Sequence, residues 1–205
     1  MITAGIILAG GLSRRMGGGD KSLLALGEQP ILAHVVDRLR GQVDVMALNA
    51  NGDAARFDPF NLPVIADSID GFAGPLAGVL AGMDWAAGQG ISQIITVAAD
   101  TPFFPEHLVS ALKMAAISDG AQLAMATTPD PDRGYNRHPT FGLWDVALRE
   151  DLRAALNSGM RKVIAWTQPI GCANVSFDGF AFDPFFNVNT PEDLVQAQQY
   201  LQGKH

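Results

Sequence analysis

The stretch Gly5–Leu24 reads GIILAGGLSRRMGGGDKSLL and joins a short apolar run to a long glycine-rich, cationic loop. The run Ile6-Ile7-Leu8 is too short for a helix and rich in branched side chains, which predicts a buried strand of a parallel sheet. Ligands of such sheets bind just beyond the carboxyl ends of the strands. Glycines let backbone amides approach a ligand, and the cations Arg14, Arg15 and Lys21 favour phosphate. We therefore expect a polyphosphate site here; the alternative is a plain turn with solvated charges.

Two common phosphate motifs do not match this loop. A dinucleotide fingerprint that starts at Gly17 continues to Gly19 but meets Ser22 where the third glycine belongs. A P-loop needs glycine directly before the lysine, and Asp20 precedes Lys21. The loop is therefore a phosphate loop of another kind.

Composition indicates a soluble globular protein. The chain has 205 residues with 48% hydrophobic and 17% charged residues, and we expect residues 1–205 to form a single domain. A net charge of −7 argues against nucleic-acid binding, and no apolar run is long enough to cross a membrane. The single cysteine, Cys172, cannot form an internal disulfide and indicates a reducing compartment. Without a recognisable signal peptide, we expect a cytoplasmic protein.

Strand and helix patterns alternate along the chain, which predicts a three-layer α/β/α fold around a mostly parallel sheet. In the first half the patterns predict strands at 6–8, 43–48, 63–66 and 93–99, and helices at 30–39 and 105–116. A loop at 71–78 is expected to lead into a further helix that ends at about residue 85. The second half is less regular. It predicts strands at 123–126, 140–144 and 172–177, of which 140–144 runs back and is a candidate antiparallel strand. Residues 180–186 are expected to lead back to the sheet, and helices are expected at 148–156, 161–166 and 191–201. Prolines and a glycine predict a mobile loop at 127–137.

Polar residues follow the four predicted strands of the first half: Gly10 with its loop, Asn49, Asp67 and Asp100. These ends lie along one edge of a doubly wound sheet and would form one cleft. Asp100 follows a largely apolar strand, so its carboxylate is well placed to hold Mg²⁺ together with substrate phosphate oxygens. The alternative is that Asp100 or Thr101 caps a turn before Pro102. Asn49 and Asp67 have turn residues as their alternative, and Gly74 has a helix-start turn.

The segment FFNVNTPED (Phe185–Asp193) combines a helix start with a pair of asparagines. Thr190 with Asp193 predicts a variant capping box, and Pro191 suits the first helical position. This explanation leaves out Asn187 and Asn189, which in extended chain point to the same face.

Three pieces of sequence carry a resemblance to a known family: Leu8-Ala9-Gly10-Gly11, Arg14-Arg15-Met16-Gly17 and Asp20-Lys21. They resemble the signature of the sugar-phosphate and cofactor nucleotidyltransferases and, with the Asn-Val-Asn-Thr-Pro-Glu-Asp run, the MobA family of molybdenum cofactor guanylyltransferases. The resemblance implies the nucleotide-diphospho-sugar-transferase-like fold. It also implies transfer of GMP from GTP to molybdenum-molybdopterin, with Mg²⁺ as cofactor. The first half would bind GTP and the second half the molybdopterin acceptor.

The resemblance also assigns roles to residues. Catalysis falls to Arg15, Lys21 and Asp100, and Asp100 would bind the metal. Nucleotide binding falls to Leu8, Ala9, Gly10, Gly11, Lys21, Asn49, Asp67, Gly74 and Asp100. Acceptor binding falls to His138, Asn187 and Asn189, although a lone histidine is more often structural than catalytic. Apart from the resemblance, the charge of Arg161 would suit the acceptor's phosphate; the alternative is that the pair Arg161-Lys162 is only solvated. Proteins that deliver or receive the cofactor are further expected partners.

Three other functions stay open at this point. A sibling enzyme would use CTP or a sugar phosphate, and a non-catalytic protein would bind the nucleotide without releasing pyrophosphate. A nicotinamide oxidoreductase is disfavoured because the glycine fingerprint is broken.

Overall fold

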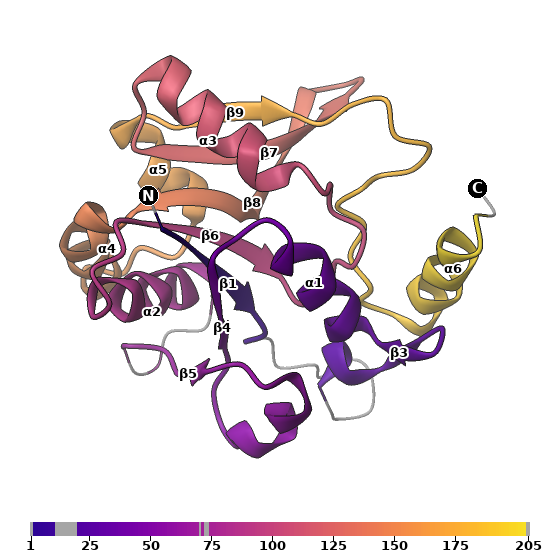
Figure 1. Cartoon of the computed structure of the whole chain (residues 1–205). Helices are drawn as coiled ribbons and strands as arrows, with labels where there is room; N and C mark the ends of the chain where they lie inside the picture. Colours follow the sequence, from indigo (N-terminus) through magenta and orange to yellow (C-terminus); the bar gives the residue numbers. More distant parts are fainter. Residues whose placement is uncertain (1, 11–19, 70, 72–73, 204–205) are drawn as a thin grey trace.

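The computed structural model describes residues 2–10, 20–69, 71 and 74–203, and Figure 1 shows them as a sheet with helices on both faces. The sheet has seven strands in the order β5-β4-β1-β6-β8-β7-β9. Their bounds are β1 Thr3–Leu8, β4 Val45–Asn49, β5 Val64–Ile65, β6 Gln93–Ala98, β7 Leu123–Asp130, β8 Gly134–Asp145 and β9 Ala173–Ser176. Strands β2 (Ala25–Leu26) and β3 (Gln29–Pro30) form a separate antiparallel pair.

The first half of the chain builds the parallel part of the sheet, as the sequence predicts. Strand β1 lies between β4 and β6 and is parallel to both, and β4 is parallel to β5. Helical crossovers between parallel strands cover both faces of such a sheet, which is why these strands are apolar runs. The four strands therefore end at one common edge, next to the segments that carry the polar residues.

The second half adds an antiparallel hairpin, and here one prediction is wrong. Residues 127–137, expected as a mobile loop, form the outer arms of the β7–β8 hairpin together with its turn. The β-branched side chains of Thr127 and Thr128 are buried in this arm, and a register shift after Met125 lets β7 continue past it. The prolines and Gly134 lie at the exposed end, where they do not interrupt the pairing. Residues 180–186, expected to return to the sheet, contain no strand.

Two apolar cores lie on opposite faces of the sheet, which makes the architecture three-layered. Helices α1 and α3 cover one face, whose core includes Ile7 and Phe104, and helices α2, α4 and α5 cover the other, whose core includes Ile6 and Trp144. The helix bounds are α1 Ile31–Arg40, α2 Pro75–Ala87, α3 Leu108–Asp119, α4 Arg149–Asn157, α5 Val163–Ile170 and α6 Pro191–Leu201. Each overlaps a predicted helix, and the boundaries differ by a few residues.

Helix α6 lies apart from the main sheet, beside the β2–β3 pair (Figure 1). A third apolar cluster joins them: Val188 and Ala197 pack with Leu26 and Ile31, all fully buried. The end of the chain is thereby fixed against the residues that follow the glycine-rich loop. No helix in the described ranges is long and apolar enough to cross a membrane.

Candidate active site

The parallel register brings the ends of the central strands to one line. Leu8, the last residue of β1, pairs with Asn49 on one side and with Ala98 on the other. Asp100 lies two residues beyond Ala98, in the turn that follows β6. The predicted alignment of Gly10, Asn49, Asp67 and Asp100 along one edge of the sheet is therefore correct.

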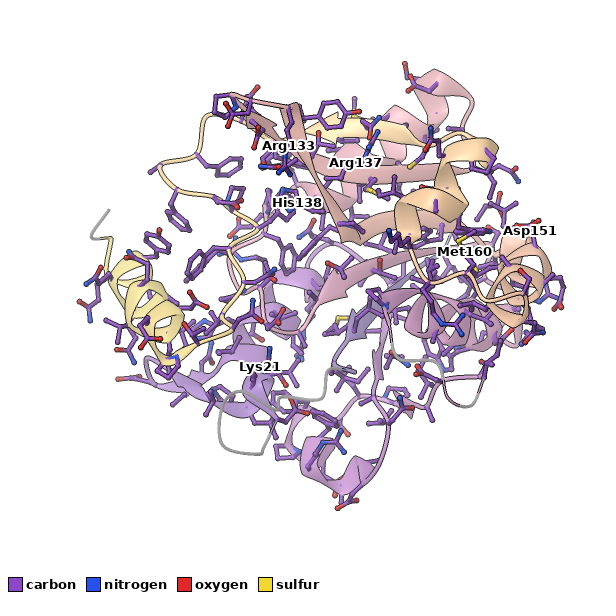
Figure 2. The ribbon with its side chains drawn as sticks, turned by 180° about the vertical axis from the view of Figure 1, so that it is seen from behind. Lys21, Arg133, Arg137, His138, Asp151 and Met160 are labelled. Carbon is purple, nitrogen blue, oxygen red and sulfur yellow. The ribbon has the colours of Figure 1, made fainter. Side chains whose placement is uncertain are left out.

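Three segments that are far apart in the sequence meet at Lys21. Its amine lies 3.9 Å from a carboxylate oxygen of Asp100. The same amine donates a 2.8 Å hydrogen bond to Oδ1 of Asn189. The two side chains of the ion pair are only 21% and 28% exposed, so water screens their charges less than at an open surface. In Figure 2, Lys21 lies below His138, near the middle of the view.

The segment before α6 is fastened to the turn that carries Asp100. The amide of Val188 donates to the carbonyl of Asp100 at 2.9 Å, and the hydroxyl of Thr101 donates to Oδ1 of Asn187. Among the described residues no backbone amide donates to the Thr101 hydroxyl, so the cap raised as an alternative for Thr101 is not formed there; the hydroxyl also lies 3.3 Å from Oδ1 of Asp100. The capping box of Thr190 and Asp193 is present as predicted.

Burial raises the pKa of the Asp100 carboxyl above its ordinary value, and the nearby charge of Lys21 opposes that shift. The carboxylate therefore has too little solvation of its own, and a further positive charge beside it would be stabilising. A small cavity of about 50 Å³, with room for a few water molecules, lies between these groups. It is lined by Leu8, Ala9, Asp20, Lys21, Ser22, Ala99 and Asp100.

A second polar group forms at the ends of β4 and β5. The side-chain amide of Asn49 donates to Oδ1 of Asp67 at 3.0 Å, and that of Asn51 donates to Oδ2 at 2.8 Å. Asn51 also accepts a bond from the backbone amide of Asp67 at 3.0 Å. The carboxylate of Asp67 is thus fixed from two sides, so it cannot act as a freely rotating turn residue.

Arg56 connects this second group to the lysine. Its guanidinium lies on the ring of Phe57, 4.4 Å from the ring centre. It donates to the carbonyls of Asn51, at 2.9 Å, and of Asp53, and it forms a 3.3 Å ion pair with Asp20. The other oxygen of Asp20 accepts from the amide of Ser22 at 3.2 Å and from its hydroxyl at 2.7 Å. The residue directly before Lys21 is therefore fixed from both sides.

Glycines allow helix α2 to approach these groups. Gly74 precedes the helix with φ 150°, a conformation that side chains disfavour. Gly78 lies in the first turns of α2, where an added Cβ would collide with the side chain of Asn49 and come within 2.8 Å of Leu8. The predicted residues Gly11 and Arg15 lie outside the described residues.

His138 lies on β8, in an aromatic environment. Its ring stacks on Phe185 at 4.2 Å, and its Nε2 shares a 2.9 Å hydrogen bond with the hydroxyl of Thr128. Burial lowers the pKa of His138, and the charge of Asp183 opposes that shift. A neutral, stacked imidazole of this kind contributes mainly to packing. Figure 2 shows His138 between Lys21 and Arg133 of the hairpin.

Arg161 is the one described candidate that lies apart from the others. Its guanidinium donates to the carbonyls of Leu156, at 3.2 Å, and Met160, at 2.7 Å, on the connection between α4 and α5. In Figure 2, Met160 lies on the opposite side of the view from Lys21.

Sequence reasoning missed Asn51 and Arg56. The run Asn49-Ala50-Asn51 at a strand end gave a weak signal for Asn51, because both amides follow the same strand. Nothing in the sequence pointed to Arg56, whose partner Asp20 is 36 residues away.

Comparisons with known proteins agree with this geometry. A family model described as MobA-like NTP transferase domain matches residues 5–170. A molybdenum cofactor guanylyltransferase from Bradyrhizobium sp. is 48% identical over 95% of this chain and 91% of its own length. One from Mesorhizobium japonicum is 47% identical over 98% of this chain and 96% of its own length.

Solved structures share the fold. The molybdopterin-guanine dinucleotide biosynthesis protein A of Archaeoglobus fulgidus superposes with a TM-score of 0.75 at 19% identity, over 98% of this chain and 100% of that one. A 4-diphosphocytidyl-2C-methyl-D-erythritol synthase of Anaerococcus prevotii also gives 0.75, at 16% identity, over 98% and 96%. The fold and the matching relatives are those of a nucleotidyltransferase. Within that class, the chain belongs to the MobA-like NTP transferase family.

Proposed function

We propose that this chain transfers GMP from GTP to molybdenum-molybdopterin and releases pyrophosphate. The observation that carries the proposal is the meeting of Lys21, Asp100 and Asn189 at the carboxyl ends of the parallel strands. The names of the relatives, which are 47–48% identical, support the same reaction. In this proposal the first half of the chain binds GTP and the second half binds the acceptor.

The chemistry needs no protein nucleophile. An oxygen of the acceptor's terminal phosphate attacks the α-phosphorus of GTP, and the bond from that phosphorus to the oxygen bridging the β-phosphorus breaks. The electron pair leaves with pyrophosphate, and the new bond is a phosphoanhydride. Cys172, the single cysteine, is not a nucleophile at neutral pH because burial raises its pKa to about 11. The protein's task is to position two anions and to stabilise charge.

Lys21 is the described cation best placed for that task. Its amine is oriented by Asn189 and by Asp100, so little rearrangement is needed when a phosphate arrives. We assign it the neutralisation of charge on the departing pyrophosphate, and we keep Arg15 as a second cation with that role. Loss of one fixed charge-stabilising donor typically lowers kcat by about 10²–10³-fold.

The donor set at Asp100 fits Mg²⁺. Mg²⁺ binds through one or two carboxylates and completes its shell with water and substrate phosphate oxygens. Asp100 offers a recessed carboxylate, and its raised pKa indicates that it lacks solvation. The described residues contain no group of three or more His, Cys, Asp or Glu side chains that could hold a metal ion by themselves. When bound, Mg²⁺ would supply positive charge to the phosphate oxygens. Asp100 is the residue that would hold it.

We assign the parts of the nucleotide other than its phosphates to the second polar group, which consists of Asn49, Asn51 and Asp67. Guanine offers N–H donors, which the fixed Asp67 carboxylate can accept. Asn49, whose amide donates to Asp67 and to the carbonyl of Ile65, would act by holding that carboxylate. Gly74 and the backbone of Leu8–Gly11 would approach the base, sugar or α-phosphate. All of these assignments are proposals for mutagenesis.

Acceptor binding is proposed for Asn187, Asn189 and His138. Arg161 remains a candidate only if the acceptor extends toward the α4–α5 connection. Proteins that deliver or receive the molybdenum cofactor are proposed partners, and a single, half-buried cysteine suits the reducing cytoplasm.

Thermal unfolding with nucleotides tests the base. GTP with Mg²⁺ should raise Tm, since a ligand at 100 times its Kd stabilises by about 2.7 kcal/mol. CTP at the same concentration should do so much less. Equal stabilisation by CTP would shift the proposal to a sibling enzyme, and stabilisation by GTP without pyrophosphate release in the presence of acceptor would leave only nucleotide binding.

Replacement of the lysine tests the chemistry. Lys21→Ala should lower pyrophosphate release by about 10²–10³-fold with an unchanged circular dichroism spectrum. Lys113→Ala is the matched control, because Lys113 bonds to Thr3 at the start of β1, at the other end of the sheet. Retained transfer by folded Lys21→Ala would refute the assigned role.

A further inference from the structure

A second pocket, larger than the cavity at Lys21, lies elsewhere on the molecule. A pocket of about 400 Å³ lies between the β7–β8 hairpin and the segment that follows β9. Thr128, Pro129 and Asn136 line it from the hairpin, and residues from 177–184 line it from the other side. We call it the hairpin pocket. Its volume is within the range of small-molecule sites, and no sequence motif predicted it.

The chemistry of this pocket excludes a phosphate and favours a ring. Its described lining residues include two carboxylates, Asp178 and Asp183, and no Lys, Arg or His. They also include Phe177, Phe180 and Phe182. The side chain of Phe180 is 43% exposed, which is unusual for a phenylalanine beside a pocket and leaves an aromatic surface for a ligand to cover. Aromatic walls with carboxylates suit a flat heterocycle that donates hydrogen bonds.

Asp183 is the better oriented of the two carboxylates. Its Oδ1 accepts a 2.9 Å hydrogen bond from the amide of Phe185, and none is made to its Oδ2 by the described residues. A carboxylate can accept two parallel N–H bonds from one partner, as it does from arginine. The 2-amino group and the N3–H of a pterin present donors in that arrangement.

A tight turn connects the hairpin pocket to the residues around Lys21. The amide of Phe186 donates to the carbonyl of Asp183 at 3.1 Å, so the Cα atoms of these two residues lie within about 7 Å. Asn187 follows at once and binds Thr101, next to Asp100. One side of the turn thus borders the hairpin pocket and the other borders the proposed phosphate site.

We propose that the hairpin pocket binds the pterin ring of the acceptor, with Asp183 accepting its N–H groups and Phe180 covering its face. This inference rests on the proposed function for the identity of the acceptor. It assigns the two ends of one substrate to two chemically different places. The ring lies among carboxylates and aromatic rings, and the terminal phosphate lies by Asn187, Asn189 and Lys21.

The kinetic test separates the substrates. Asp183→Asn should raise the KM for the acceptor about tenfold, since hydrogen bonds to charged groups are the stronger ones, and Phe180→Ala about fivefold. The KM for GTP should stay unchanged in both. Asp132→Asn, on the hairpin turn outside the pocket, is the matched control and should change neither value. An unchanged KM for the acceptor in both pocket variants would overturn the proposed pterin site without contradicting the transfer reaction. A raised KM for GTP instead would show that the pocket binds guanine.

A binding test works without transfer. Wild-type protein should bind 6-hydroxymethylpterin, which has no phosphate, in isothermal titration calorimetry, and Asp183→Asn should bind it about tenfold more weakly. If the protein binds this pterin but transfers no GMP, the assignment of the hairpin pocket to a pterin stands and the proposed function is refuted. No binding by the wild-type protein, together with normal acceptor kinetics in both variants, would refute the pocket.

Discussion

The two sides of this site are built by different physical means. On the side proposed to bind the nucleotide, side-chain hydrogen bonds run from Asp67 through Asn51 and Arg56 to Asp20, next to Lys21. On the side proposed to bind the acceptor, the ring of Phe185 packs against those of His138, Phe141 and Phe177, with centres 4.2, 4.8 and 5.5 Å away. The polar side fixes directions of donors and acceptors, and the aromatic side fixes shape.

This difference predicts how each side responds to mutation. Partly exposed hydrogen bonds contribute little net stability each, because water replaces them, but their geometry determines what can bind. Buried aromatic rings contribute much of the stability and tolerate small changes in direction. Substitutions on the polar side should therefore change binding, and substitutions on the aromatic side should change folding.

The largest stability effect is expected at Phe185, which is 3% exposed. Phe185→Ala should lower the free energy of unfolding by about 3–5 kcal/mol, the usual range for truncating a buried aromatic ring. Urea unfolding measures it. The control is Phe180→Ala, at a ring 43% exposed, which should cost less than about 1 kcal/mol.

If the two sides are separate as described, GTP should still raise the Tm of Phe185→Ala by the wild-type increment. Loss of that increment would show that the aromatic side also shapes the nucleotide side.

A smaller, purely functional effect is expected at Arg56. Arg56→Met removes the link between Asn51 and Asp20, so the KM for GTP should rise about tenfold, the effect of about 1.4 kcal/mol. The kcat should fall less, since Lys21 itself remains. Arg56→Lys should rescue only partly, because lysine lacks the planar fork.

Arg153→Met provides the comparison for Arg56. Arg153 pairs with Asp84 at 2.6 Å and with Glu150 at 3.1 Å, on helices of the opposite face. Replacement of Arg153 by Met should leave the KM for GTP unchanged. An equal rise in both variants would mean that the effect is general destabilisation.

The smallest effect is a pH dependence from His138. Burial lowers its pKa in the folded state, so the unfolded chain binds more protons at pH values between that lowered pKa and the unperturbed value of about 6.5. Its contribution to stability is therefore present above about pH 6.5 and is lost as the pH falls. The slope contributed by one proton cannot exceed about 1.4 kcal/mol per pH unit.

Thermal or urea unfolding between neutral and mildly acidic pH checks this. The difference between the wild type and His138→Gln removes the contributions of the other histidines. The variant should show a flatter dependence, and identical slopes would contradict the buried, neutral histidine.

The sequence predicted the regular parts of the fold because local chemistry decides them. The parallel strands are short branched apolar runs, and the start of α6 follows from Thr190, Pro191 and Asp193. The hairpin arm at 127–137 was missed because its prolines and Gly134 suggest a loop, whereas pairing with β8 decides its structure. That pairing depends on the rest of the sheet and has no local signal.

The candidate site likewise contains residues that local sequence predicts and residues that only tertiary packing brings together. Asp100 and Asn49 were predicted because strand ends can be recognised locally. The role of Arg56 depends on a contact with a residue far along the chain, and the hairpin pocket depends on the hairpin that was missed. Side chains brought together by tertiary packing alone stay invisible in a single sequence.

The bond from Lys21 to Asn189 joins residues 168 positions apart. Proteins are synthesised from the N-terminus, so the glycine-rich loop and Asp100 leave the ribosome long before Asn189 does. A chain that stopped before residue 189 would hold Lys21 and Asp100 without the amide that orients the lysine. The orientation of Lys21 therefore depends on a segment that is synthesised long after the parallel strands.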